Sequence, residues 1–409
     1  MMVDVANCTG CQACSLICPT GCIRMEVDHE GFRFPKIDKA ECIDCKLCVL
    51  RCPDNSPQFR ENSVQRVIGA RLKDRELLLK SASGGVFAGI ARHVLQTPGS
   101  AVFGCAFDKD LDKDLDKDSD KDLVARHVCV TDAKDIEPLQ SSKYVESDVG
   151  DTYTQTKQLL EQEKTVLYSG TPCQIAGLYA FLGRDYDNLF TMDLICHGVP
   201  SPLLFKRYVT WLGKKHGGKV IDYSFRSKDK RGWGKCCKVV VKTKSKTKRL
   251  YPNLKLDPYY SQFLAAGTYR ESCYVCKYSA SSRVGDITIG DFWGVELAHP
   301  GFHSKDGVSV ILVNSQKGGD LLNTALINYE IIESTFDNAA IYQGNLSKPT
   351  KRPEVRDTAL QDIHNDDVSF LEKGCYRISG IKRIRQMYTF VPSFIRRAYR
   401  NIQKKAADS

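Results

Sequence analysis

Two cysteine runs with the same spacing lie near the N-terminus of this 409-residue chain and constrain its fold more than any other feature. The runs read Cys8-x2-Cys11-x2-Cys14-x3-Cys18-Pro19 and Cys42-x2-Cys45-x2-Cys48-x3-Cys52-Pro53. Three thiolates separated by two residues can surround one corner of a cubane cluster, and the proline keeps the turn from continuing as a helix. Each run therefore predicts ligands of a metal cluster.

The spacing is that of bacterial ferredoxins, in which the fourth cysteine of each run crosses to the other cluster. We therefore predict two 4Fe-4S clusters in a ferredoxin-like dicluster domain over residues 1–58. The expected ligands of the first cluster are Cys8, Cys11, Cys14 and Cys52, and those of the second are Cys42, Cys45, Cys48 and Cys18. A zinc ribbon or a disulfide knot is the alternative and fits two complete runs poorly. Cys22 is left over and is expected to pack as a small apolar residue.

Composition supports cofactor binding in a cytoplasmic protein. Eighteen cysteines are many for a compartment in which disulfides are rare. No basic-then-apolar leader and no apolar run of membrane-spanning length is present, so a cytoplasmic location is expected. The formal net charge of +10 suggests nucleic-acid binding as a hypothesis, but no RNA-binding or helix-turn-helix motif accompanies the charge. We therefore expect no nucleic-acid partner.

The rest of the chain predicts a larger mixed α/β body, so the fold class is α+β or α/β. Expected divisions are a linker over 59–80, a first part of the body over 81–147, an α/β domain over 148–330 and an extension over 331–409. Residues 108–122 repeat Asp-Lys-Asp-Leu. A solvated hairpin extension is favoured there over a calcium loop, because the glycine and terminal glutamate of such a loop are missing.

Two segments of the body point to ligand binding. The run Ser83-Gly84-Gly85-Val86 opens a predicted helix whose free backbone amides would suit a phosphate, although such a run is often only a helix start. Residues 165–169 and 189–195 read as parallel strands joined by a helix over 174–183. The segments that follow these two strands then emerge at one carboxyl edge of the sheet, where α/β folds bind ligands.

Four cysteines of the body form a candidate third site. Cys173 and Cys196 lie at that carboxyl edge, with Cys173 at a helix N-terminus that favours a thiolate. Cys273 and Cys276 alone read as a redox pair or half of a zinc site, but together with the other two they complete four ligands. We therefore predict a third 4Fe-4S cluster on these four residues. The remaining body cysteines are expected to be structural: Cys105, Cys129, Cys236, Cys237 and Cys375.

Five stretches between residues 80 and 315 carry a family resemblance. They are Ser83-Gly-Gly-Val-Phe87, Ser142-Lys-Tyr-Val145, the stretch from Ser169 to Gly177, the stretch from Asp193 to Ser201, and the block from Cys273 to Gly294. Together they resemble the coenzyme F420 hydrogenase/dehydrogenase beta-subunit family. The fused dicluster domain is similar to F420H2-oxidising and related stand-alone members.

The resemblance implies a flavin, usually FAD, a 4Fe-4S cluster beside it and reversible hydride transfer. The flavin is expected near Ser83, Gly84, Gly85, Val86, Gly170, Thr171 and Gln174, with His197 and Asp291 as polar contacts or as structural residues. The predicted protein is a flavin-dependent iron–sulfur oxidoreductase. It would move electrons between its clusters and a two-electron carrier or organic substrate, and would work with a redox partner protein or small-molecule carrier.

The substrate stays open at this point. Coenzyme F420, NAD(P)H, ferredoxin and a sugar-linked compound of bacterial surface-polysaccharide synthesis all fit the resemblance. A non-catalytic electron-delivery subunit for a partner reductase is the alternative function, and a zinc-binding interaction protein fits poorly. The basic stretch 388–405 would suit the inner face of an anionic membrane as a peripheral helix. A basic helix docked on the protein is the alternative, which we favour.

Overall fold

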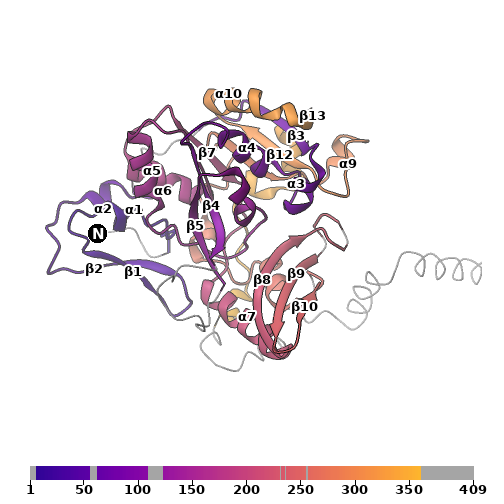
Figure 1. Cartoon of the computed structure of the whole chain (residues 1–409). Helices are drawn as coiled ribbons and strands as arrows, with labels where there is room; N and C mark the ends of the chain where they lie inside the picture. The colour runs from indigo at the N-terminus through magenta and orange to yellow at the C-terminus, as the bar shows by residue number, and fades with distance from the viewer. Residues whose placement is uncertain are drawn as a thin grey trace, which may run out of the picture.

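The computed structural model describes residues 6–55, 62–108, 123–230, 232–234, 236–254 and 257–360. Figure 1 shows three parts: an N-terminal module beside α5 and α6, a large sheet with its helices, and a small sheet formed by β8, β9 and β10. The expected mixed α/β body is confirmed. The predicted features of residues 109–122, the basic tail and Cys375 lie outside the described residues.

The two cysteine runs fold alike in the N-terminal module. Helix α1 (Ala13–Leu16) follows Gln12 at φ 65°, and helix α2 (Leu47–Leu50) follows Lys46 at φ 62°. Each helix therefore starts one residue before the third cysteine of its run. Strands β1 (Ile23–Val27) and β2 (Arg33–Ile37) pair as an antiparallel ribbon between the two runs.

The large sheet has eight strands in the order β13-β3-β12-β11-β7-β6-β4-β5. Its strands are β3 (Arg66–Leu72), β4 (Ala101–Asp108), β5 (Val124–Val130), β6 (Val166–Gly170), β7 (Leu189–Leu194), β11 (Ile287–Asp291), β12 (Ser309–Val313) and β13 (Tyr329–Ser334). Strands β4, β6, β7 and β11 run parallel, and the others pair antiparallel with their neighbours. The predicted parallel pairing of β6 with β7 is confirmed.

Helices cover the faces of this sheet, and the main ones are α3 (Arg75–Lys80), α4 (Val86–Val94), α5 (Thr152–Glu161), α6 (Pro172–Leu182) and α10 (Gln316–Ala325). Helices α3, α4 and α10 share one apolar core, whereas α5 and α6 share another together with Ala13 of the module. Shorter elements are α9 (Val295–Ala298), α11 (Phe336–Ala340), α12 (Arg356–Ala359), η1 (Ala133–Asp135), η2 (Glu137–Leu139), η3 (Glu271–Val275), η4 (Leu326–Asn328) and η5 (Gly344–Leu346).

A linker was expected over residues 59–80. In the described part of that range, the structure has a strand and a helix instead. Strand β3 lies inside the sheet between β13 and β12, and α3 follows it. The charged residues that suggested a linker form ion pairs with residues on a neighbouring strand. Arg66 Nε donates to Glu333 Oε2 at 3.1 Å, and Arg71 Nε donates to Glu330 Oε2 at 2.8 Å. Their partners lie on β13, far along the chain.

The small sheet has a largely aromatic core. Strands β8 (Gly218–Ser227), β9 (Cys236–Thr243) and β10 (Thr247–Leu250) pair antiparallel, with α7 (Pro202–Lys215) and α8 (Pro258–Leu264) packed nearby. Cys237 is buried in this core, whereas Cys236 Sγ lies 3.6 Å from Ser227 O. No helix within the described ranges is both long enough and apolar enough to cross a membrane.

Gly84 precedes α4 and packs closely against the sheet, so a substitution there tests this packing. Gly84 N donates to Ser309 Oγ at 2.9 Å, and a Cβ on Gly84 would lie 2.2 Å from Ala70 O. We expect Gly84→Ala to lower the free energy of unfolding by about 1–3 kcal/mol, because backbone atoms of β3 must move away. Gly319→Ala on α10 is the control, since its Cβ would meet only Val313 Cγ1 at 3.5 Å. Equal urea midpoints for the two variants would contradict this.

Candidate functional site

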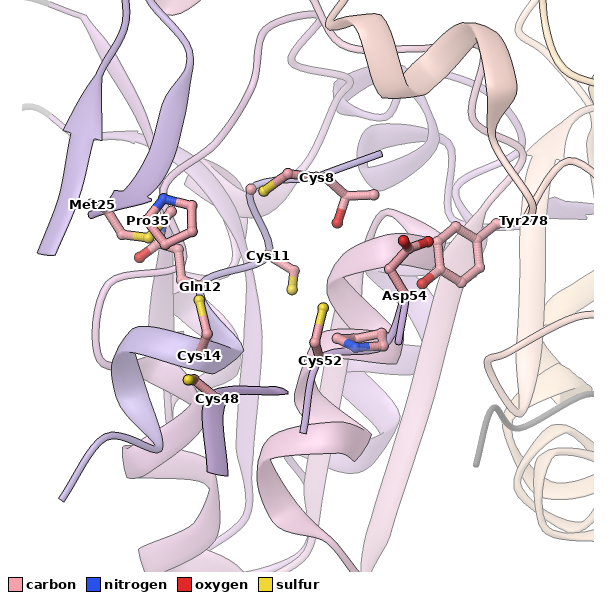
Figure 2. A pocket seen from close by; sticks show the side chains of 13 residues that line it. Cys8, Cys11, Gln12, Cys14, Met25, Pro35, Cys48, Cys52, Asp54 and Tyr278 are labelled. Carbon is pink, nitrogen blue, oxygen red and sulfur yellow. The ribbon is translucent and has the colours of Figure 1, made fainter. Parts of the chain in front are cut away.

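The first cysteine group consists of Cys8, Cys11, Cys14 and Cys52, which line one cavity in the N-terminal module. Figure 2 shows the Cys11 and Cys52 side chains pointing toward one another, with Tyr278 of the body at one side. Cys52 comes from the second run, so the fold itself brings the crossing cysteine to the first site. The structure therefore assembles the four residues predicted for one cluster.

The second cysteine group consists of Cys18, Cys42, Cys45 and Cys48, which line a neighbouring cavity. Cys48 lines both cavities, so the two sites adjoin. Cys42 and Cys45 are exposed. This site therefore lies at the outer end of the module.

Cys22 is buried, in agreement with its expected packing as a small apolar residue, and it also lies close to the second cysteine group. Its sulfur lies 3.4 Å from Cys18 Sγ, and the residue lines the second cavity. The intervening Gly21 has φ 66°, and its amide donates to Cys18 O at 3.2 Å. This tight turn folds Cys22 back onto the site, and the Pro-Thr-Gly sequence before it was the available signal.

The third cysteine group consists of Cys173, Cys196, Cys273 and Cys276, on segments that converge at the carboxyl ends of β6 and β7. Burial raises the pKa of Cys173 well above its ordinary value, and the thiols of Cys276 and Cys196 raise it further. Burial also raises the pKa of Cys196 to about 12, with Cys276 as a second cause. For the free thiols, these effects outweigh the thiolate preference expected at the start of α6. The four sulfurs therefore lie close together in a water-poor site.

Arg283 holds two segments of the third group in place. Its guanidinium donates to Tyr278 O at 3.1 Å, to Asp193 Oδ1 at 2.9 Å and to Leu194 O at 3.0 Å. Both side chains of the ion pair are buried, so the pair fixes geometry more than it adds stability. It ties the end of β7 to the segment that follows η3.

The donor sets fit iron–sulfur clusters better than single ions. A single zinc ion would need its sulfurs about 2.3 Å from a common point. Within the described ranges, no group of three or more His, Cys, Asp or Glu residues is placed to hold one metal ion. A four-iron cluster spreads its thiolates further apart, and thiolates are its usual protein ligands.

The first and third groups lie against each other across the module boundary. A Cβ on Gly177 of α6 would lie 2.8 Å from Cys11 Cβ. Cys11, Cys173 and Cys276 pack against the same apolar cluster. Tyr278 lines the first cavity and is buried in this same cluster, so it lies close to both groups. The cysteine groups therefore form a row in the order second, first, third.

A large cavity continues this row into the body. The space between its atoms totals about 1580 Å³ with the solvent at its mouth included, and both Cys173 and Cys196 form part of its wall. Eight of the residues predicted to contact a flavin also line it: Ser83, Gly85, Val86, Gly170, Thr171, Gln174, His197 and Asp291. Gly84 is the exception among the predicted residues. It packs against the backbone of β3 and β12 instead.

Several predicted contacts are already engaged with protein groups. The Asp291 carboxylate accepts hydrogen bonds from Arg226 at 2.8 Å and from Trp233 Nε1 at 2.6 Å. Burial lowers the pKa of His197, and a hydrogen bond with Asn345 partly opposes this fall. Ser83 Oγ donates to Val308 O at 2.8 Å. These side chains shape the wall of the cavity.

The structure adds a loop over residues 139–147 that sequence reasoning did not place in the site. Lys143 Nζ donates to Pro138 O and Gln140 O at 2.7 Å each, and to Ser141 O at 3.3 Å. Burial lowers the pKa of Lys143 to about 8. Cys105, expected to be structural, lines the same cavity. The available signal was the Ser142 to Val145 stretch of the family resemblance, to which no chemistry had been assigned.

A hydrogen-bonded chain forms part of the cavity wall. Gln174 Nε2 donates to Ser147 Oγ at 2.9 Å, and Ser147 Oγ lies 3.3 Å from His127 Nδ1. His127 Nε2 lies 3.1 Å from Ser169 O. Since a carbonyl can only accept, Nε2 carries the proton and Nδ1 accepts from the serine. The chain fixes one neutral tautomer of His127.

Two family models match this chain. Residues 7–56 match the 4Fe-4S dicluster domain, and residues 163–339 match the C terminus of the beta subunit of coenzyme F420 hydrogenase/dehydrogenase. The chain is thus an iron–sulfur protein whose body is similar to redox-enzyme subunits. Over the matched residues the chain is similar to both families, and the resemblance found in the sequence is confirmed.

Similarity to a solved structure extends over much of the chain. That structure is a chain of the F420-reducing NiFe hydrogenase complex from Methanosarcina barkeri, in a xenon-derivatised form, at 18% identity with a TM-score of 0.42. The match covers 66% of this chain and 82% of that one. No curated protein matches the chain.

The burial of His127 gives a pH dependence with a definite sign. Burial lowers the pKa of His127 from 6.5 to about 4. Between these pH values the unfolded chain binds the additional proton, so the free energy of unfolding falls as pH drops from about 6.5 toward 4. We expect His127→Gln to reduce this slope in urea unfolding between about pH 7.5 and 5. His93→Gln on α4 should keep the slope, and an unchanged slope in the His127 variant would refute the assignment.

Proposed function

We propose that the protein is an iron–sulfur flavoprotein oxidoreductase. In this proposal, three 4Fe-4S clusters occupy the three cysteine groups, FAD occupies the large cavity, and electrons are exchanged with a two-electron organic carrier. One observation carries the proposal: the row of cysteine groups ends on Cys173 and Cys196, which line the cavity. Such a row connects the module surface to a site with room for an organic cofactor and its substrate.

A flavin supplies the needed chemistry, because it exchanges two electrons with an organic carrier and single electrons with clusters. The chain would bind it through the start of α4, where Gly85 at φ 80° turns the backbone before the first free amides. The start of α6 adds few donors, because Pro172 has no N–H and the capping box of Thr171 and Gln174 occupies the amides of both residues. Phosphate groups suit the start of α4 because the helix dipole favours negative charge there.

The walls of the cavity would orient the rings and exclude water. Leu139, Phe263 and Ile289 give apolar surface, and Arg226 holds Asp291 against Trp233 on one side. Lys143 places a cation on the opposite loop, where it would favour negative charge on a bound ring. Excluding water strengthens each of these interactions.

The exposed second cysteine group is the natural contact for a redox partner protein, and the carrier at the cavity is proposed to be coenzyme F420, NAD(P)H or a sugar-linked substrate. The proposed location is the cytoplasm, where the thiols stay reduced. Residues 388–405 are the segment that would reach a membrane surface, if the protein contacts one.

Cofactor content tests the proposal. Anaerobically purified protein is expected to hold about twelve irons per chain, four for each cluster, and one flavin. Cys273→Ser/Cys276→Ser should retain about eight irons, because the N-terminal groups are untouched. Cys129→Ser, which changes an exposed cysteine, is the control and should retain all of them.

Two outcomes would count against the proposal. About eight irons in the wild-type protein would remove the third cluster. Clusters without flavin absorption bands would favour the non-catalytic electron-delivery subunit instead. Parallel anaerobic reduction with F420H2, NADH, NADPH and reduced ferredoxin then identifies the donor.

A further inference from the structure

A fully buried arginine joins the N-terminal module to the body next to the first cysteine group. Arg270 is 1% exposed and lies just before η3. Its Nε donates to Cys8 O at 2.7 Å, and its Nη2 donates to Arg33 O at 2.8 Å. Nη2 also lies 3.7 Å from Cys8 Sγ. A guanidinium of the body therefore touches the sulfur of a predicted cluster ligand.

The surrounding chain is shaped to admit this guanidinium. Its carbon lies 4.0 Å from the centre of the Phe34 ring, on the module side. A Cβ on Gly10 would lie 3.0 Å from Arg270 Nη1, and Gly10 has φ 69°, so a side chain there would be both strained and crowded. The close approach of the cation to Cys8 thus depends on a glycine inside the first cysteine run.

The charge of Arg270 is paired on the side away from the sulfur. Nη1 donates to Glu146 Oε2 at 2.9 Å, and the Glu146 side chain is 7% exposed. The ion pair is therefore a buried dipole with its positive end against Cys8. Screening is weak at such burial, so each member acts on nearby charge more strongly than a surface group would.

We propose that the Arg270–Glu146 pair sets the reduction potential of the first cluster. One-electron reduction makes a cluster with four thiolate ligands more negative by one charge. A cation against Cys8 stabilises that reduced form and raises the potential, and the carboxylate opposes it from further away. The proposal needs the cluster of the dicluster domain and does not depend on the flavin, so it can fail or hold separately from the proposed function.

A purely structural role would be to fasten the module to the body, and a second arginine provides the matched comparison. Arg356 is 2% exposed and donates to Glu30 Oε1 at 2.7 Å and Oε2 at 2.6 Å. Its Nε donates to Tyr269 O at 2.8 Å, next to Arg270 in the chain. Arg356 thus fastens the same two parts through Glu30 and not through a cysteine.

The test is an anaerobic redox titration of the full-length protein, monitored by EPR, with iron content checked for each variant. Arg270→Gln should shift the midpoint of the first cluster to lower potential, and Glu146→Gln should shift it to higher potential. Arg270→Lys should lie closer to wild type than Arg270→Gln. Arg356→Gln should leave this midpoint in place, and the midpoint of the second cluster should stay constant throughout.

Opposite shifts from the two members of one ion pair cannot come from loosened docking alone. Shifts in the same direction for Arg270→Gln and Glu146→Gln would overturn the proposal. So would an Arg270→Gln midpoint equal to that of Arg356→Gln. If Arg270→Gln does not retain its clusters, Glu146→Gln decides alone: a raised midpoint supports the proposal, and an unchanged or lowered one overturns it.

Discussion

Gly177 lies where helix α6 meets the N-terminal module, and the rest of the architecture depends on how closely the two approach there. A Cβ at this position would lie 2.8 Å from Cys11 Cβ and 2.9 Å from Tyr153 Oη. The missing side chain lets the first cysteine group sit directly against α6, which carries Cys173 in its first turn. Because electron transfer weakens steeply with distance, the proposed transfer between the module and the body depends on this contact.

Buried arginines of the body support this approach. Arg270 and Arg356 each bind module groups, and Arg283 ties together segments of the third group within the body. All three are almost fully buried. Burying such charges costs desolvation energy even when they are paired, so their value lies in fixed geometry. The parallel strands β6 and β7 then deliver the third group and the cavity wall to a common edge.

Local sequence patterns predicted part of the fold and of the site, whereas features that depend on long-range contacts were not predicted. The cysteine runs and the β6–α6–β7 unit follow from spacing and periodicity, whereas eight residues of the cavity wall follow from the family resemblance. Strand β3 was missed because Arg66 and Arg71 look like linker residues until Glu333 and Glu330 are placed beside them. Gly84 looked like a phosphate loop residue, but the tertiary fold uses it for close packing.

The same limit explains the residues that were not singled out. Arg270 has no motif of its own, since its role appears only when Cys8 and Glu146 are folded around it. Cys22 is different, because a local turn brings it to Cys18 and the Pro-Thr-Gly sequence was a usable signal. Residues that act through a partner distant in sequence carry no local signature.

Rapid mixing of the oxidised protein with a limiting two-electron donor, followed by freeze-quench EPR, tests the central claim most directly. The donor is the one that reduces the wild-type protein in the parallel assay. In the wild-type protein, reduced N-terminal clusters should appear after the flavin is reduced. In Cys273→Ser/Cys276→Ser, the flavin should still be reduced while those clusters stay oxidised. Equal rates of cluster reduction in the two proteins would contradict a path through the third cysteine group.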